Sequence, residues 1–303
     1  MSLEFSASNI LWHEFEKNNN PSATVESEQL DKVKSFVNAF FQSHSRTCEA
    51  QLQPVSRWVN SQNLTFTTML KKLVTQLEEQ ALVNDLDLVV LTHWTPDAEI
   101  GASVTNAIIY ETGSHNAFGI AISDHGLSSG FVALQIIEDY LEDISGDKRP
   151  RKALLMMADQ DAILYDSPYL ANFHPAASCC LLLLQSNATH EPHKVADNIT
   201  FKNYQKTSLP VSTADIYPLL STLKMFSAAE NALPLIILTS KSFSQVLQRD
   251  ANFSGVRIET WDDALLSSAP WVLLKKLAQK NTRFLLMMPE GKNMIFASFV
   301  MES

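Results

Sequence analysis

Glycine is scarce in this sequence: 8 of its 303 residues are glycine, about a third of average usage. A loop that cradles a phosphate group needs several glycines close together, because only glycine lets the backbone approach the phosphate closely. No such cluster occurs in the chain. The sequence therefore contains no nucleotide-binding fingerprint of this kind.

Cysteine is also rare. The three cysteines are Cys48, Cys179 and Cys180, an odd number with two of them adjacent. This pattern excludes a framework of paired disulfides, and the spacing does not fit a zinc site. We therefore expect a protein of the reducing cytoplasm.

Positive charge is in deficit, with 23 Lys and Arg against 33 Asp and Glu, which gives a net charge of −10. A protein that binds nucleic acid over its surface normally carries the opposite sign, so we expect no nucleic-acid partner. The apolar runs are too short for a transmembrane helix, and residues 1–15 lack the basic and apolar regions of a signal peptide. We therefore expect no membrane span.

Apolar residues make up 46% of the chain, which predicts a large packed core. Apart from helices over 27–41 and 68–81, the first 80 residues have no regular pattern. From there the periodicity becomes orderly, with branched apolar runs typical of strands and amphipathic segments typical of helices. Strands are predicted at 86–92, 117–123, 152–158, 177–185, 234–239, 255–260, 283–288 and 294–301. Helices are predicted at 102–112, 128–144, 216–229, 242–249 and 264–279.

The order of these elements repeats. Residues 86–185 and residues 234–301 both give strand, helix, strand, helix, strand, strand. Alternating strands and helices predict parallel sheets covered by helices, and two copies of one order predict an internal duplication. We place the boundary near residue 195, between an N-terminal half at 1–195 and a C-terminal half at 196–303.

Several short motifs occur in a fixed order in the first half. Thr95-Pro96-Asp97 follows the strand at 86–92, Gly113 and Asn116-Ala117 precede the next strand, and Leu127-Ser128-Ser129-Gly130-Phe131 opens the helix after it. In these motifs the chain resembles the thiolase-fold condensing enzymes of the ketoacyl synthase III type, whose nucleophile turn reads Ala-Cys-Ser-Gly-Phe. The resemblance covers about two thirds of the chain. It implies two pseudo-repeated α/β halves in five layers, αβαβα, and a role in fatty-acid-like or specialised-metabolite biosynthesis.

The sequence departs from the family at the residues that carry its chemistry. Ser128 stands where the family has its cysteine, and no histidine occurs in 238–242, where the family has one. Asp263 stands near the family's asparagine, and the glycine-rich closing loop is reduced to 289–293 around Gly291. A decarboxylative condensation needs a cysteine thiolate to carry the acyl chain, and a histidine and an asparagine as donors that stabilise the enolate. The loss of all three groups argues against ordinary ketosynthase activity.

One hypothesis is that Ser128 is itself a nucleophile that forms an acyl ester, which would make the protein an acyltransferase. A serine needs a general base, and His125, His190 and His193 are the candidates, with Asp263 to orient one of them. The competing interpretation is that the histidines are ordinary loop residues and that Ser128 only packs the turn.

His93, Trp94, Gly130 and Gly291 are the candidate substrate-binding residues. The two bulky side chains narrow the acyl tunnel that the resemblance implies, or belong to the core, and the two glycines lie at turns beside the reacting groups. No bound cofactor and no metal are expected. The resemblance implies acyl-CoA, or the phosphopantetheine of an acyl carrier protein, as the acyl donor.

Two other functions remain open. The resemblance implies a dimer, formed with a second copy or with a relative through the strand at 117–123. In one of the two functions, the chain is a catalytically inactive subunit that pairs with an active relative. Alternatively, the protein binds an acyl chain or a carrier protein without chemistry. Residues 148–152 form a basic cluster, which fits docking of an acidic carrier protein or a solvated loop before a strand.

Overall fold

The computed structural model describes residues 2–16, 27–43, 64–80, 82–123, 125–143, 150–161, 170, 172–187, 197–210, 215–222 and 230–302. Its helices are α1 Ser27–Ser43, α3 Phe66–Glu78, α4 Val104–Glu111, α5 Ser129–Asp143, α7 Ile216–Thr222, α8 Lys241–Leu247 and α9 Ala269–Leu277. Its strands are β1 Ser2–Ser6, β2 Leu11–Glu14, β3 Leu88–Thr92, β4 Phe118–Ile122, β5 Lys152–Asp159, β6 Ser178–Asn187, β7 Asn198–Ser208, β8 Leu235–Thr239, β9 Arg257–Thr260, β10 Thr282–Glu290 and β11 Asn293–Met301.

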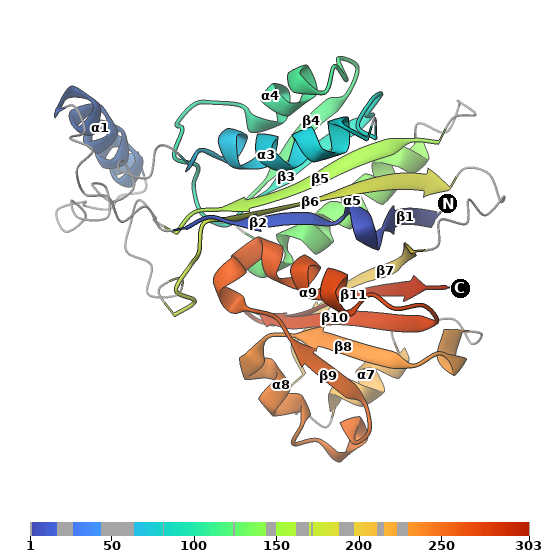
Figure 1. Cartoon of the computed structure of the whole chain (residues 1–303). Helices are drawn as coiled ribbons and strands as arrows, with labels where there is room; N and C mark the ends of the chain where they lie inside the picture. Colours follow the sequence, from blue (N-terminus) through green and yellow to red (C-terminus); the bar gives the residue numbers. More distant parts are fainter. Residues whose placement is uncertain are drawn as a thin grey trace.

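The described strands follow the order β4-β3-β5-β6-β1-β7-β11-β10-β8-β9, with β2 paired to β6 beside β1 (Figure 1). In the N-terminal half β3 is parallel to β4 and β5, and β6 is antiparallel to β5. In the C-terminal half β8 is parallel to β9 and β10, and β11 is antiparallel to β10. The two halves therefore repeat one topology, and β1 and β7 join them through antiparallel pairing.

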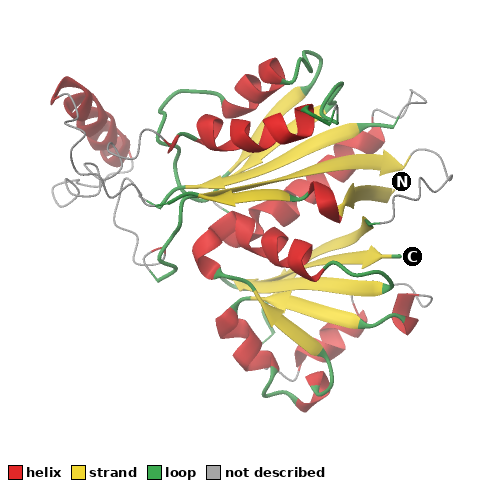
Figure 2. Ribbon diagram, viewed as in Figure 1, coloured by secondary structure: helices red, strands yellow, loops and turns green. Residues whose placement is uncertain are grey.

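Three clusters of buried side chains separate the layers. A central cluster joins α5 and α9 to the facing sides of both sets of strands. A second cluster packs α3 and α4 against β3, β5 and β6, and a third packs α7 and α8 against β8, β10 and β11. The sequence of layers is thus helices, strands, the central pair α5 and α9, strands, and helices (Figure 2).

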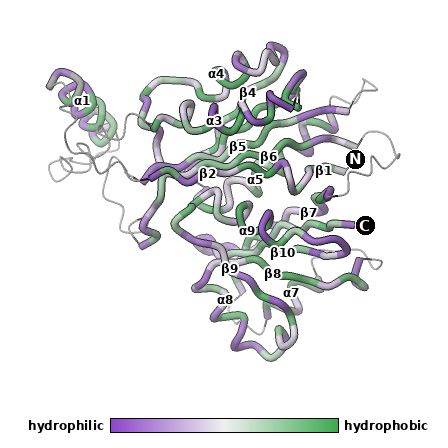
Figure 3. The backbone as a smooth tube through the Cα atoms, in the orientation of Figure 1, coloured by the Kyte–Doolittle hydropathy of each residue, from purple (hydrophilic) through white to green (hydrophobic). Residues whose placement is uncertain are grey.

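The apolar runs identified in the sequence form the inner strands of both halves. Every residue of β3 is buried, and so are most residues of β5, β10 and β11. Figure 3 shows this hydrophobic character concentrated along the strands. Strands buried on both faces read as continuous apolar runs because helices cover each side.

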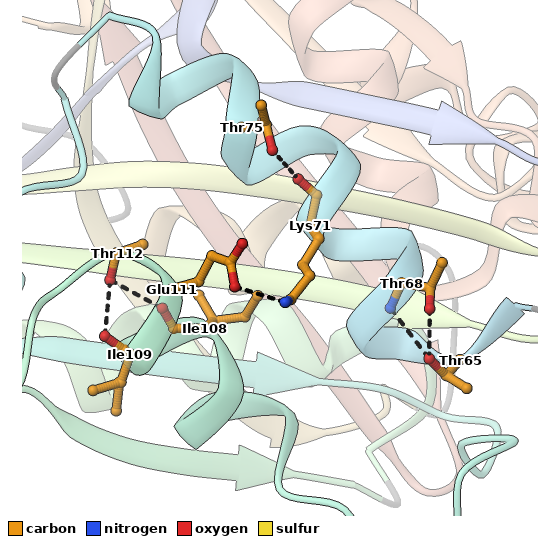
Figure 4. Close-up of polar contacts among 8 residues, drawn as sticks. All are labelled: Thr65, Thr68, Lys71, Thr75, Ile108, Ile109, Glu111 and Thr112. Atoms are coloured by element: carbon orange, nitrogen blue, oxygen red, sulfur yellow. Dashed lines mark hydrogen bonds and ion pairs between the residues drawn. The ribbon is translucent and has the colours of Figure 1, made fainter.

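The polar surface contacts of the outer helices α3 and α4 are of ordinary kinds and add little to their stability. Thr65 caps α3 by accepting a hydrogen bond from the Thr68 N–H at 3.2 Å, and Lys71 pairs with Glu111 across the two helices at 2.6 Å (Figure 4). The side chains of this ion pair are 42% and 37% exposed, so it adds at most about 1 kcal/mol. The packing of α3 against the strands carries most of its stability.

Two parts of the fold differ from the sequence prediction. The opening residues, expected to be irregular, form the strands β1 and β2. The eleven-residue strand β7 was not predicted. Both β1 and β7 bury only alternate residues at their paired ends, such as Leu3, Phe5, Ile199 and Phe201. The boundary expected near residue 195 lies outside the described residues and stays a prediction.

Candidate active site

The turn that carries Ser128 is a short 3-10 helix, Gly126–Ser128, immediately before α5. Gly126 has φ +50, a left-handed conformation that glycine adopts without the steric cost of a Cβ. The Ser128 N–H donates to the carbonyl oxygen of His125 at 3.1 Å, and Ser128 is fully buried. The hydroxyl is therefore held at the N-terminal end of α5, where the helix dipole favours negative charge.

The Ser128 hydroxyl lies beside a carboxyl group. Its Oγ is 2.8 Å from Glu290 Oε2 and 2.9 Å from the carbonyl oxygen of His125. A hydroxyl has one proton, so Ser128 donates to one of these oxygens at a time. When Glu290 is ionised it is the stronger acceptor, since hydrogen bonds to charged groups are stronger than neutral ones.

Glu290 is placed by the hairpin between the last two strands. It is the final residue of β10, and its register partner Asn293 opens β11 after the two-residue turn Gly291-Lys292. Gly291 has φ +59, which is the requirement of a tight hairpin turn with glycine first. The hairpin thus brings a carboxyl group of the C-terminal half to the nucleophile turn of the N-terminal half.

The surroundings of Glu290 shift its protonation in opposite directions. Burial raises the pKa of Glu290 above its ordinary value, while the hydrogen bond from Ser128 and the charges of His125 and Lys206 lower it and offset burial only in part. Burial, together with the negative charge of Glu290, also raises the pKa of Tyr204. Tyr204 and Lys206 lie on β7 opposite Ala297 and Ile295, whose side chains belong to the central core cluster.

A second serine–carboxylate pair mirrors the first. Ser267 lies just before α9 as Ser128 lies just before α5. The Ser267 N–H donates to Asp159 Oδ2 at 3.0 Å, and its hydroxyl also donates to that oxygen. Asp159 ends β5, the strand that corresponds to β10 in the repeated topology. Each half therefore supplies the serine of one pair and the carboxyl group of the other.

The two pairs differ in the number of hydrogen bonds that the carboxyl group accepts. Asp159 is completely buried, and its Oδ1 accepts from the N–H groups of Trp94 and Thr95, at 2.8 Å each, and from the Thr95 hydroxyl at 3.2 Å. Burial raises the pKa of Asp159, and the hydrogen bonds from Ser267, Thr95 and Trp94 act against that effect. Glu290 is only half-buried, and among the described residues Ser128 is the one side chain hydrogen-bonded to it. Asp159 is thus saturated by donors, whereas Glu290 retains capacity to take a proton.

Of the residues expected to serve as base and orienting group, His125 lies near Ser128, and Asp263 is bonded elsewhere. The His125 side chain lies close enough to Glu290 for its charge to lower the carboxyl pKa, but the contact with Ser128 is made by the His125 backbone. Asp263 accepts a hydrogen bond from Trp261 Nε1 at 2.9 Å, and no described histidine is hydrogen-bonded to it. Burial raises the pKa of Asp263. His190 and His193 lie outside the described residues.

Of the two bulky residues expected to bind substrate, Trp94 lies beside the serine turn. A Cβ on Gly126 would lie 3.8 Å from the Trp94 ring and 3.1 Å from Glu290 Oε1, so Gly126 lies against both groups. The His93 ring contacts the Thr95 carbonyl at 2.8 Å and lies 5.4 Å from the ring of Phe66.

The two glycines take different places. Gly130 packs against the indole of the buried Trp271, which would lie 2.7 Å from a Cβ at this position. Gly291 occupies the hairpin turn beside Glu290, and a Cβ there would meet open space. The substrate-binding roles of all four residues stay predictions.

Sequence reasoning missed Glu290, Tyr204 and Lys206. Glu290 lies in the segment 289–293, from which only Gly291 was selected, and a single carboxyl group before a turn is an ordinary surface pattern. Tyr204 and Lys206 lie on the strand that was not predicted. One signal was present: Leu127-Ser128-Ser129 and Leu266-Ser267-Ser268 repeat at the same place in the two halves.

In the described part of the chain, no group of three or more His, Cys, Asp or Glu side chains is placed to hold a metal ion. Among its helices, none has the length and apolar character that crossing a membrane requires.

The sequence matches no protein-family model and no curated protein. Its structure, however, resembles solved structures of condensing enzymes. Xanthomonas campestris OleA with bound cerulenin aligns with a TM-score of 0.57 and 14% identity, over 77% of this chain and 81% of that one. ChlB3, described as an acyltransferase, aligns with a TM-score of 0.54 and 14% identity, over 80% and 84%.

A third similar structure has a serine in place of a cysteine. It is a cysteine-to-serine variant of Xanthomonas campestris OleA with bound lauric acid and lauroyl-CoA, and it aligns with a TM-score of 0.53 and 14% identity, over 72% and 77% of the two chains. The fold of this chain is thus the thiolase-like fold of such condensing enzymes, in agreement with the five layers expected from the sequence.

Proposed function

We propose that this chain, whose fold is that of the thiolase-like condensing enzymes, transfers acyl groups through an ester on Ser128 with Glu290 as the general base. The observation that carries the proposal is the 2.8 Å contact between Ser128 Oγ and Glu290 Oε2 at the start of α5. It supplies the base that a serine nucleophile needs, and it does so without a histidine. The raised pKa of Glu290 makes this carboxyl group a better proton acceptor than an ordinary glutamate.

The proposed reaction has two halves. In the first, the hydroxyl proton of Ser128 moves to Glu290 while Oγ attacks the carbonyl carbon of an acyl thioester. The bond from carbon to sulfur breaks, and the leaving thiolate of CoA or carrier-protein phosphopantetheine takes the proton from Glu290. In the second, an acceptor nucleophile loses a proton to Glu290 and releases the acyl group from Ser128, whose Oγ recovers the proton.

Access is a condition of this reaction. Ser128 has no exposed surface, so an acyl donor reaches it only when the groups around the turn separate. The positive end of α5 favours the negative charge that develops as the thioester is attacked. A family-type decarboxylative condensation is not proposed, since the chain has no thiol at this position.

Intact-protein mass spectrometry after incubation with acyl-CoAs, beginning with lauroyl-CoA, and with acyl carrier proteins tests the proposal. We expect one acyl adduct that maps to the peptide containing Ser128 and is absent from Ser128→Ala. Ser129→Ala is the matched control, because this neighbouring hydroxyl is also buried and has no hydrogen-bond partner among the described residues. An adduct that persists in Ser128→Ala would refute the proposal.

A second candidate function is that of an inactive subunit. One observation favours it: β4 ends the described sheet, and Phe118 on this strand is 55% exposed. A strand edge of this kind accepts a further strand from another chain. Failure of every donor to acylate Ser128, together with an assembly that Phe118→Glu disrupts in light scattering, would support this function instead. Donor binding without adduct or assembly would support a binding module.

A further inference from the structure

Two backbone segments form walls of the Ser128 site: the first is Trp94-Thr95 and the second is the segment that contains Ser267. Asp159 joins these two walls. Its Oδ1 accepts from the backbone of Trp94 and Thr95, which follow β3 in the N-terminal half. Its Oδ2 accepts from the backbone and hydroxyl of Ser267, in the turn before α9 of the C-terminal half. One carboxylate therefore ties together two segments that come from different halves of the fold.

The first wall leads directly to the serine turn. The Trp94 ring lies against Gly126, and Gly126 also lies against the Glu290 carboxyl group. Fixing the backbone of Trp94 at Asp159 thus fixes the ring beside which the turn Gly126–Ser128 is built.

The second wall contains a residue with a strained backbone conformation. Leu266, next to Ser267, is completely buried with φ 44 and ψ −123, a backbone conformation that is unfavourable for leucine. Such a conformation persists only where the surrounding bonds enforce it, and Ser267 supplies two bonds to Asp159. The segment Asp263–Ser268 that contains Leu266 contacts the Ser128 turn.

We infer that Asp159 is a positioning residue, which holds the Trp94 and Ser267 segments so that Ser128 and Glu290 meet. This inference rests on the proposed function for its effect on acyl transfer. The donors to Asp159 are Trp94, Thr95 and Ser267, and among the described residues it has no hydrogen bond to Ser128 or Glu290. It therefore acts on that pair through the two walls.

Asp159→Asn tests the inference, and Asp87→Asn is its matched control. Asp87 is a second buried carboxylate, immediately before β3, and it accepts hydrogen bonds from Arg151 Nη1 at 2.6 Å and from the Lys152 N–H at 2.9 Å. Asp87 is bound to Lys152, the first residue of β5, whereas Asp159 is the last residue of that strand. At 3.3 Å per residue, the length of β5 separates the two carboxylates by about 23 Å. Both variants disturb the fold, but only one disturbs the site.

Two measurements are made on each variant of the full chain. The first is the rate of Ser128 acylation against donor concentration. For Asp159→Asn we expect the maximal rate to fall roughly 10- to 100-fold, with little change in the half-saturating donor concentration. The second is hydrogen exchange of the peptide spanning 125–131, which we expect to become faster in Asp159→Asn. Asp87→Asn leaves both readouts close to wild type.

Equal effects of the two variants, or unchanged exchange at 125–131 in Asp159→Asn, would overturn the inference. If the wild type is never acylated, the proposed function fails, and the exchange measurement alone decides this inference. If Asp159→Asn does not fold, Ser267→Ala replaces it, since this variant removes only the hydroxyl donor and keeps the N–H bond. The same faster exchange at 125–131 is then expected, and its absence would count against the inference.

Discussion

Gly130 of α5 lies directly against the indole of Trp271, a residue of the other central helix, α9. A Cβ at position 130 would lie 2.7 Å from Trp271 Nε1 and 3.0 to 3.1 Å from two ring carbons. The indole has no room to retreat, because Trp271 is completely buried and its ring packs edge-on against Phe131 and Phe299. Gly130→Ala therefore forces one helix away from the other beside the Ser128 turn.

The cost follows from two opposing terms. Overpacking a filled core costs about 1 to 3 kcal/mol, whereas replacing glycine by alanine in a helix returns at most about 1 kcal/mol. We expect a net loss of about 1 to 2 kcal/mol in the free energy of unfolding for Gly130→Ala. Trp271→Phe leaves space in the core and costs a similar amount, about 1 to 2 kcal/mol. It loses no hydrogen bond, since Trp271 Nε1 has no partner among the described residues.

The double variant tests the reasoning. The alanine methyl group occupies space that the smaller ring vacates, so the two costs should not add, and we expect a favourable coupling energy of about 1 kcal/mol or more. Urea unfolding of the four proteins, followed by circular dichroism, measures this coupling. Additive losses would show that Gly130 and Trp271 do not limit the approach of the helices.

Three further outcomes follow from the structure. Ser129→Ala removes a buried hydroxyl without a partner among the described residues, so we expect unchanged or slightly higher stability, by up to about 1 kcal/mol in urea unfolding. A loss of more than that would reveal a missed bond. The folded-state pKa of Glu290 is raised, so its ionisation costs stability as the pH rises through that pKa. Glu290→Gln should therefore match wild type near pH 4 and be the more stable protein at pH 8 in thermal unfolding, and a constant difference would contradict this. Burial raises the pKa of Cys179 to about 12 and that of Cys180 well above its ordinary value, so iodoacetamide at pH 8 should leave both unmodified until the protein unfolds, as peptide mapping would show.

The parts of the fold that the sequence predicted are those with continuous apolar runs or strong helical periodicity. Leu88–Thr92 and Asn293–Met301 are buried along nearly their whole length, and burial on both faces leaves an unmistakable pattern. The strand Asn198–Ser208 escaped prediction because its partners, not its residue types, make it a strand. Lys202, Asn203 and Gln205 read as a loop in isolation, and tertiary pairing overrides that preference.

The site was predictable only in part. The position of Ser128 before a central helix followed from its motif, and the structure has it there. Its neighbour Glu290 is 162 residues away, and only the closing hairpin brings the two together. A local sequence pattern carries no information about such a contact. The repeated Leu-Ser-Ser motif was visible, but its meaning depends on carboxyl groups supplied by the opposite half.

The pH dependence of Ser128 acylation tests the central claim most directly. The claim predicts that the acylation rate, measured by intact mass with a donor that loads the protein, rises through a single ionisation at a pKa above that of an ordinary glutamate, because only ionised Glu290 can take the Ser128 proton. In Glu290→Gln the rate should be low and nearly independent of pH over the same range. A wild-type rate that stays constant with pH, or a Glu290→Gln protein that acylates like wild type, would contradict the account.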